Sequence, residues 1–131
     1  MKKEKSFSYE KFRSSFSLNC PDDFNFAFDI ISNKYGKSEK TALIAINNNG
    51  NDFKKVSYKD LDENSSRFAN ALINLGIKKK DKILIILPKI VEWYYCILGC
   101  AKVGAIAIPS TPMLKANDIE YRIQTSEAKV I

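Results

Sequence analysis

The sequence contains no histidine, and its five glycines stand far apart among 131 residues. Histidine is the commonest general base, so its absence also excludes Ser-His and Cys-His nucleophile systems from these residues. The separated glycines form no glycine-rich loop of the kind that holds phosphate groups through backbone N–H donors. The residues therefore give no sign of a self-contained small nucleotide-binding protein.

Long apolar runs are also missing. No stretch of about 18 apolar residues occurs, so the sequence predicts no membrane-spanning helix. The basic start of the chain is not followed by an apolar segment, as a secretory signal would be. Glu4 and Glu10 argue against an organellar transit peptide, and we expect a cytoplasmic protein.

Cysteine is scarce, and its spacing does not suit a metal site. Cys20 is isolated, whereas Cys96 and Cys100 lie four residues apart on a predicted buried helix. A tetrahedral site would need a second pair of ligands, and the sequence has no histidine to supply one. We expect Cys96 and Cys100 to be free thiols that pack as small apolar side chains, and we assign no metal ligand.

The charge of +6 comes mainly from lysines that are spread along the chain. A nucleic-acid interface would need a basic stripe together with a reader motif or regularly spaced stacking aromatics. Neither occurs, so we expect no nucleic-acid binding. The 45% apolar and 27% charged residues instead indicate one globular domain of ordinary size.

The pattern divides the chain into a polar N-terminal extension, residues 1–20, and an α/β region, residues 21–131. We expect the extension to lie over a neighbouring surface. A helix is predicted over residues 21–36 because Asp22 and Asp23 suit a helix start. Asn-Gly at positions 49–50 predicts a β-hairpin over residues 41–56.

Helices and strands alternate in the remaining sequence. The predicted elements are a helix opened by a capping box at Ser57 and Asp60 and closed by Gly76, an apolar strand at 82–87, a helix at 90–103, a strand at 105–108, a loop at 109–115, a helix at 117–125 and a strand beginning at 129. We expect Leu75 on the apolar face of the first helix and the second helix, which is apolar nearly all round, to be deeply packed. Strands separated by helices of this length predict a mostly parallel sheet with helices on both faces.

Several short motifs stand in the order found in the N-terminal domain of the adenylate-forming superfamily, which this chain resembles. They include a Leu-Pro-x-x-x-Glu-Trp junction at residues 87–93 and a Gly-Ala-x-x-x-Pro strand at residues 104–109. The segments FNFAFDII, ILGCAKVGA and MLKANDIEYRIQTSEAKVI are more specifically similar to medium-chain acyl-CoA synthetases. The fold expected from this resemblance is an incomplete N-terminal subdomain of the adenylate-forming fold, the partial AMP-binding domain.

The resemblance implies an ATP-dependent ligase that activates a medium-chain fatty or aromatic carboxylate as an acyl-adenylate and transfers it to CoA. ATP, Mg²⁺ and CoA are then the cofactors of the full-length enzyme. The family's phosphate loop, its adenine and Mg²⁺ motifs and its catalytic lysine are expected beyond residue 131. We therefore expect an N-terminal fragment, truncated before the phosphate loop, that is inactive alone and binds no cofactor tightly.

The alternative is a non-catalytic interaction module or remnant that binds a partner, including the missing remainder of the fold. Copurification with tagged candidate partners would separate that module from an inactive fragment.

One residue is nominated as close to a substrate. Thr111 lies in Ser110-Thr111-Pro112, after the carboxyl end of a predicted strand, where open α/β sheets place ligands. We assign no catalytic and no cofactor-binding residue. Met113 departs from the family pattern, so we carry over no CoA contact from this loop.

Lys80 stands where the family usually has glycine, and we expect the backbone there to avoid a positive φ.

Overall fold

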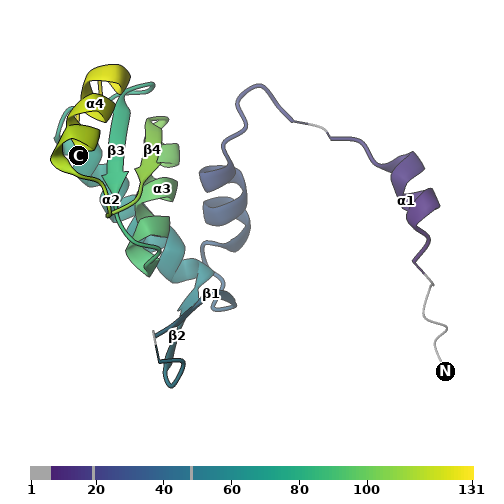
Figure 1. Ribbon diagram of the computed structural model, residues 1–131. Helices are drawn as coiled ribbons and strands as arrows, with labels where there is room; N and C mark the ends of the chain where they lie inside the picture. The colour runs from purple at the N-terminus through teal and green to yellow at the C-terminus, as the bar shows by residue number, and fades with distance from the viewer. Residues whose placement is uncertain (1–6, 19, 48) are drawn as a thin grey trace.

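The computed structural model describes residues 7–18, 20–47 and 49–131 (Figure 1). The elements follow in the order α1 (Tyr9–Ser15), the π-helix η1 (Ala27–Tyr35), β1 (Thr41–Ile46), β2 (Phe53–Ser57), α2 (Tyr58–Asn74), β3 (Lys82–Ile86), α3 (Val91–Val103), β4 (Ile106–Ser110) and α4 (Ala116–Ser126). Within these residues, no helix combines the length and the apolar character needed to cross a bilayer.

The α/β architecture expected from the sequence is confirmed. β3 and β4 pair in parallel, from Lys82 opposite Ile106 to Ile86 opposite Ser110. Val130 adds a parallel bridge to Ile83 on the other edge of β3, where a further strand was expected to begin. β1 and β2 form the predicted hairpin, which is a separate antiparallel sheet.

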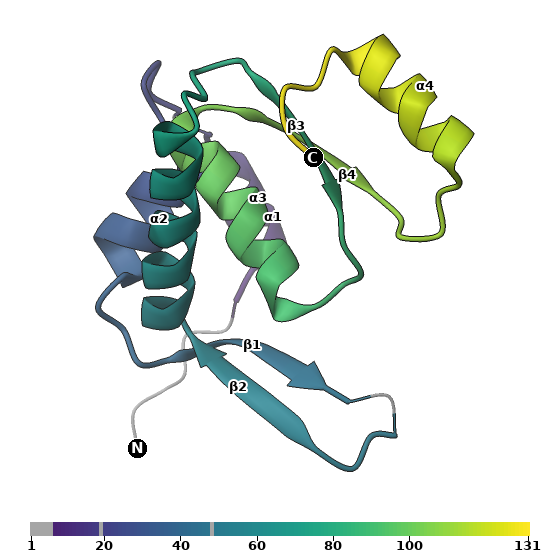
Figure 2. The same cartoon turned by 90° about the vertical axis from the view of Figure 1, so that its left-hand side faces the viewer.

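Helices lie on both sides of the parallel strands, α2 and α3 on one and α4 on the other (Figure 2). The side facing α2 and α3 holds the main core, in which Leu72 and Cys100 pack on Ile83 and Ile85. A second core forms where η1, the hairpin, α2 and α3 meet, around Ile31, Val56, Leu61 and Val91. α4 itself contains no buried residue.

Gly99 sets the close approach of α2 and α3. A Cβ atom at this position would lie 2.7 Å from Cδ1 of Phe68 and 2.8 Å from the carbonyl oxygen of Ser65, both on α2. These separations are shorter than ordinary van der Waals contact, so only glycine lets the two backbones come this near.

A charged cluster ties η1 to the helix pair. Nζ of Lys102, on α3, donates to Oδ1 of Asp62 at 2.6 Å and to Oγ of Ser66 at 2.7 Å, both on α2. Ser32 of η1 donates its hydroxyl to the same Asp62 carboxylate. Burial opposes ionisation of Asp62, but the hydrogen bonds from Lys102 and Ser32 outweigh it and hold its pKa below the usual value.

The predicted helix over residues 21–36 begins later than expected. The helix η1 starts at Ala27, while Asp22 and Asp23 lie in a turn. Asn25 supplies the start, because its Oδ1 accepts the Ala27 N–H and its own N–H donates to Oδ2 of Asp29. This reciprocal arrangement resembles a capping box and satisfies two backbone N–H groups near the helix start.

Packing of the other helices is looser than predicted. In α3 only Val91, Gly99 and Cys100 are buried, and Tyr94 is exposed. Leu75, which was expected on the apolar face of α2, is 67% exposed because the helix ends before it. β4 also runs two residues further than predicted, through Pro109 to Ser110.

The N-terminal extension, whose residues 1–6 and 19 lie outside the described residues, contains a helix that the sequence did not predict. α1 spans seven residues, and every described residue of the extension is exposed. Figure 1 shows α1 well apart from the helices and strands that form the two cores. The described part of the extension, residues 7–18 and 20, therefore does not lie over the two cores.

The expectation for Lys80 was wrong. Its φ is +73°, in the left-handed region, and its N–H donates to the Gly104 carbonyl oxygen at 2.8 Å. That hydrogen bond joins the turn before β3 to the turn before β4, and it requires the conformation that glycine adopts most readily.

Replacing Lys80 with glycine should stabilise the fold. A left-handed conformation costs a residue with a side chain roughly 1–2 kcal/mol, and glycine loses roughly 0.5–1 kcal/mol more backbone entropy on folding. The balance is a gain of about 0.5–1 kcal/mol in the free energy of unfolding, measured by urea titration. Lys78→Gly, at a position without a positive φ, should lower that free energy. An equal loss of unfolding free energy in both variants would contradict a strained left-handed conformation at Lys80.

Lys102→Met should destabilise the fold by about 3 kcal/mol at neutral pH, because it leaves the Asp62 carboxylate without its cation. Because Asp62 has a lowered pKa in the folded chain, its contribution is complete above its unfolded pKa, at about pH 4. The contribution is lost as the pH falls through the folded-state pKa. Urea titrations from about pH 7 to about pH 2 should therefore show a weaker acid dependence in Asp62→Asn.

Lys59→Met is the matched control, because it removes an exposed ion pair with Glu39. We expect it to change the free energy of unfolding little. A Lys102→Met variant as stable as Lys59→Met would rule out the structural role of the Lys102–Asp62 pair.

Candidate functional site

A hollow of 290 Å³ lies at the carboxyl ends of β3 and β4. Parallel strands end at the same edge of a sheet, so the segments that follow them face each other there. The lining includes Pro88, Lys89, Trp93, Pro109, Ser110 and Thr111.

Local sequence rules explain how these residues reach the hollow. Pro88 follows the end of β3, and α3 begins at Val91, which places Trp93 in the first turn of the helix. β4 extends to Ser110, and Thr111 and Pro112 turn the chain away toward α4. The hollow is thus framed by two strand ends and one helix start.

Thr111, which follows the carboxyl end of β4, lies at the hollow. Its side chain is exposed, and its Oγ1 accepts the Met113 N–H at 3.3 Å. The hydroxyl therefore helps to shape the turn while it lines the rim of the hollow. Its closeness to a substrate stays a prediction.

Ser110 is the residue that sequence reasoning passed over in favour of Thr111. Its Oγ is buried and has no hydrogen-bond partner among the described residues. A buried hydroxyl without a partner costs free energy, so a group that enters the hollow and pairs with this oxygen would recover it. No sequence signal identified Ser110, because its burial depends on β4 extending past Pro109.

Charge in the hollow comes from one exposed lysine, Lys89. Its ammonium group and the Ser110 hydroxyl are suited to a polar or anionic group of modest size. Trp93 is half-buried and provides an apolar wall. Glu92, in the same turn of α3, is exposed.

No group of three or more acidic, histidine or cysteine side chains that could hold a metal ion occurs in the described part of the chain. Cys96 and Cys100 are both free thiols. Burial raises the pKa of Cys96 above its usual value and that of Cys100 to about 11. Both thiols are therefore protonated near neutral pH and are poor nucleophiles.

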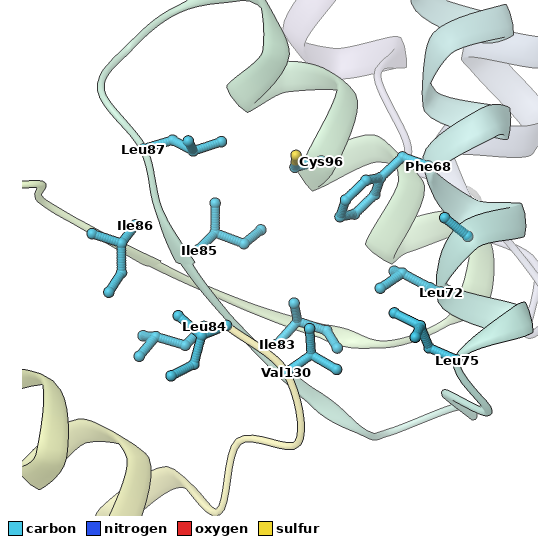
Figure 3. A pocket seen from close by; sticks show the side chains of 12 residues that line it. Phe68, Leu72, Leu75, Ile83, Leu84, Ile85, Ile86, Leu87, Cys96 and Val130 are labelled. Atoms are coloured by element: carbon cyan, nitrogen blue, oxygen red, sulfur yellow. The ribbon is translucent and has the colours of Figure 1, made fainter.

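A second cavity is apolar and measures 380 Å³. Figure 3 shows side chains of α2 and β3 that line it, among them Phe68, Leu72 and Ile85, with Cys96 of α3 above and Val130 beside β3. It offers apolar contact rather than chemistry, because aliphatic and aromatic carbon dominates its wall.

The lysine-rich turn, residues 78–80, lies away from the hollow, before the start of β3. The N–H of Lys78 donates to Oδ2 of Asp81, and Nζ of Lys129 lies 2.7 Å from Oδ1 of the same carboxylate. These bonds hold the pKa of Asp81 below its usual value, with the Lys129 hydrogen bond the largest cause. The three lysines of this turn are exposed to solvent.

Ser110→Ala should leave the free energy of unfolding unchanged or raise it by up to about 1 kcal/mol, because it removes a buried hydroxyl without a partner. Ser65→Ala is the matched control, since the Ser65 hydroxyl is fully buried and donates to the Asp62 carbonyl oxygen. That control should lose about 1 kcal/mol. Urea titration compares the two, and equal losses would show that Ser110 already has a partner.

Comparison with known protein families gives one match over most of the chain. The family model described as "AMP-binding enzyme" matches residues 32–131. Human acyl-coenzyme A synthetase ACSM3, a mitochondrial protein, is 34% identical over 131 residues, which are 95% of this chain and 22% of that protein. Human ACSM2A, also mitochondrial, is 37% identical over 118 residues, or 85% of this chain and 20% of that protein.

Solved structures show the same likeness. The acyl-CoA synthetase of Brucella canis superposes with a TM-score of 0.78 at 29% identity, covering 93% of this chain and 24% of that one. A benzoate CoA ligase from Burkholderia xenovorans LB400 gives a TM-score of 0.67 at 28% identity, covering 82% and 21%. The chain thus spans about a fifth of the length of the curated relatives that it matches.

Proposed function

Because this chain belongs to the AMP-binding enzyme family, we propose that it forms the N-terminal part of an ATP-dependent acyl-CoA ligase. The observation that carries the proposal is the match of residues 32–131 to the family model, with acyl-CoA synthetases among the relatives and the solved structures. The likeness to the medium-chain group, expected from three short segments, agrees with the ACSM relatives.

In the proposed reaction, a carboxylate oxygen attacks the α-phosphorus of ATP, and pyrophosphate leaves with the electrons of the broken P–O bond. The thiol of CoA then attacks the acyl carbon, loses its proton, and displaces AMP. Both steps move negative charge, so they need Mg²⁺, a cationic side chain and backbone N–H groups around the phosphates.

The described residues do not fit ATP with Mg²⁺. The hollow at the carboxyl edge contains no carboxylate pair for a metal ion, and no glycine-rich turn accompanies it. We therefore assign no reaction step to this chain and propose that the nucleotide is held by residues outside these 131. The chain's own contribution is a parallel strand edge whose Ser110, Thr111 and Lys89 can border a substrate.

The substrate that we propose is a medium-chain fatty or aromatic carboxylate. The relatives and the neighbouring benzoate CoA ligase support this class, because their names describe acyl-CoA or aroyl-CoA formation. Thr111 is proposed to lie near that substrate, at the rim of the hollow.

The alternative function is a non-catalytic interaction module or remnant. The 380 Å³ apolar cavity beside β3 favours it, because such a surface can bind another polypeptide.

The compartment proposed from the N-terminal sequence is the cytoplasm, whereas the human relatives are mitochondrial proteins. Imaging of a C-terminally tagged chain would decide between the two compartments.

A chimaera tests the proposed function. The region of human ACSM3 that this chain matches would be replaced by the 131 residues, and the product assayed for acyl-AMP and acyl-CoA with ATP, Mg²⁺, CoA and a panel of fatty acids and benzoate. We expect activity in the chimaera and none in the isolated chain or in ACSM3 lacking that region. Thr111→Val in the chimaera should raise KM for the acid more than it lowers kcat.

Intact human ACSM3 is the positive control for the assay. A chimaera that is soluble and unfolds cooperatively, yet forms neither acyl-AMP nor acyl-CoA, would favour the interaction module over the ligase.

A further inference from the structure

The N-terminal arm, defined as residues 7–18, carries large apolar side chains that this chain leaves in solvent. Those side chains and their exposed fractions are Phe7 at 76%, Tyr9 at 64%, Phe12 at 51%, Phe16 at 56% and Leu18 at 87%. Scattered exposed apolar residues are common on proteins, whereas a gathering of them usually marks a contact surface.

Three of the rings form a continuous row. The ring centroids of Phe7 and Phe12 lie 5.7 Å apart, and those of Phe12 and Phe16 lie 5.5 Å apart. Phe12 and Phe16 are four residues apart, a spacing that places side chains on one face of a helix. The aromatic row, defined as Phe7, Phe12 and Phe16, is therefore a contiguous apolar strip.

None of the described residues of the chain buries a side chain of the arm. α1 contains seven residues and buries none of them, and isolated helices of this length are unstable in water. Figure 1 shows α1 standing away from the helices and strands of the two cores, with the segment after it leading back to η1. A helix so placed needs a surface from another polypeptide segment.

The comparison with a solved structure bears on where such a surface would come from. The Brucella canis structure covers 93% of this chain, so fewer than ten of the 131 residues are unmatched and part of the arm has a counterpart there. Only 24% of that structure's chain is matched. The arm is thus shared with a protein whose larger part has no equivalent among these residues.

We propose that the aromatic row docks on the part of an acyl-CoA ligase fold that lies outside these 131 residues, clamping that part to the α2–α3 body. This inference rests on the proposed function. It adds that the aromatic row is the surface that contacts the rest of the ligase fold. The partner chemistry is apolar, because the row offers carbon-rich faces that gain from burial.

A lipid surface fits the arm less well. Lys11 and Arg13 are balanced in part by Glu10 within the described arm, whereas binding to an anionic membrane needs a strongly basic face. Folding of the arm onto this chain's own apolar cavity is a third possible contact. Both are outcomes of the test below, and either would overturn the proposal.

Trypsin cleavage after Arg13, followed by mass spectrometry, reports whether the arm is covered. We expect rapid cleavage in the isolated chain and cleavage slowed by at least about tenfold in the chimaera with ACSM3, because cleavage requires a free, extended backbone. Phe12→Ser with Phe16→Ser should restore rapid cleavage in the chimaera. Glu10→Gln, a change on the same helix outside the aromatic row, should leave the protection intact.

Equal cleavage rates in the isolated chain and the chimaera would overturn the proposal. Slow cleavage in the isolated chain alone would show folding onto its own surface. Protection only upon addition of phosphatidylserine-containing vesicles would show a lipid contact instead. If the chimaera is insoluble, the isolated chain is mixed with the separately produced remainder of ACSM3, and the absence of protection then counts against the proposal.

The same chimaera separates this inference from the proposed function. Acyl-CoA formation with an unprotected arm would reject the docking of the aromatic row and keep the ligase. A protected arm without acyl-CoA formation would keep the docking and reject the ligase.

Discussion

The close contact of α2 with α3 at Gly99 is the constraint on which the rest of the structure depends. Because the two backbones meet without a side chain between them, Leu72 and Cys100 reach the same face of β3 and complete one core. The same approach brings Lys102 within reach of Asp62, and through that carboxylate it fastens η1. A wider separation would open the core and leave a buried ammonium group without its anion, and each of these changes costs several kcal/mol.

The helices on the two faces of β3 are packed unequally, although side chains of β3 are buried on both faces. β3 is apolar after Lys82, with Ile83 and Ile85 packed beneath α2 and α3 and Leu84 on the opposite side (Figure 3). α4 covers that opposite side without burying any of its own residues, and an apolar cavity stays open beside Val130. A strand with this composition suits a parallel sheet that is covered by helices on both faces.

Much of the fold could be predicted because its signals are local. The capping box at Ser57 and Asp60, the left-handed Gly76 and Gly104 and the Asn-Gly turn each depend on a few neighbouring residues, and all are observed. The failures involve tertiary context. Lys80 adopts a positive φ because Gly104, 24 residues away, accepts its N–H, and no local rule contains that partner. Asn25 was missed as a helix start because Asp22 and Asp23 gave a stronger acidic signal nearby.

In the candidate site, too, the features with local causes could be predicted and those that depend on tertiary contacts could not. Pro88 and Pro112 follow strand ends, so the place of the hollow could be inferred from the order of strands and prolines, and Thr111 was correctly placed at that edge. Ser110 could not be recognised, because its hydroxyl becomes buried only when β4 extends through Pro109 against β3. The shape of the hollow is thus determined by these residues. The proposed ligase chemistry needs hydrogen-bond donors to phosphate and a metal ion, and the one lysine among the residues that line the hollow does not supply them. An edge that is shaped but holds one charged side chain among the described residues supports the proposal that the chain contributes one wall of a larger site.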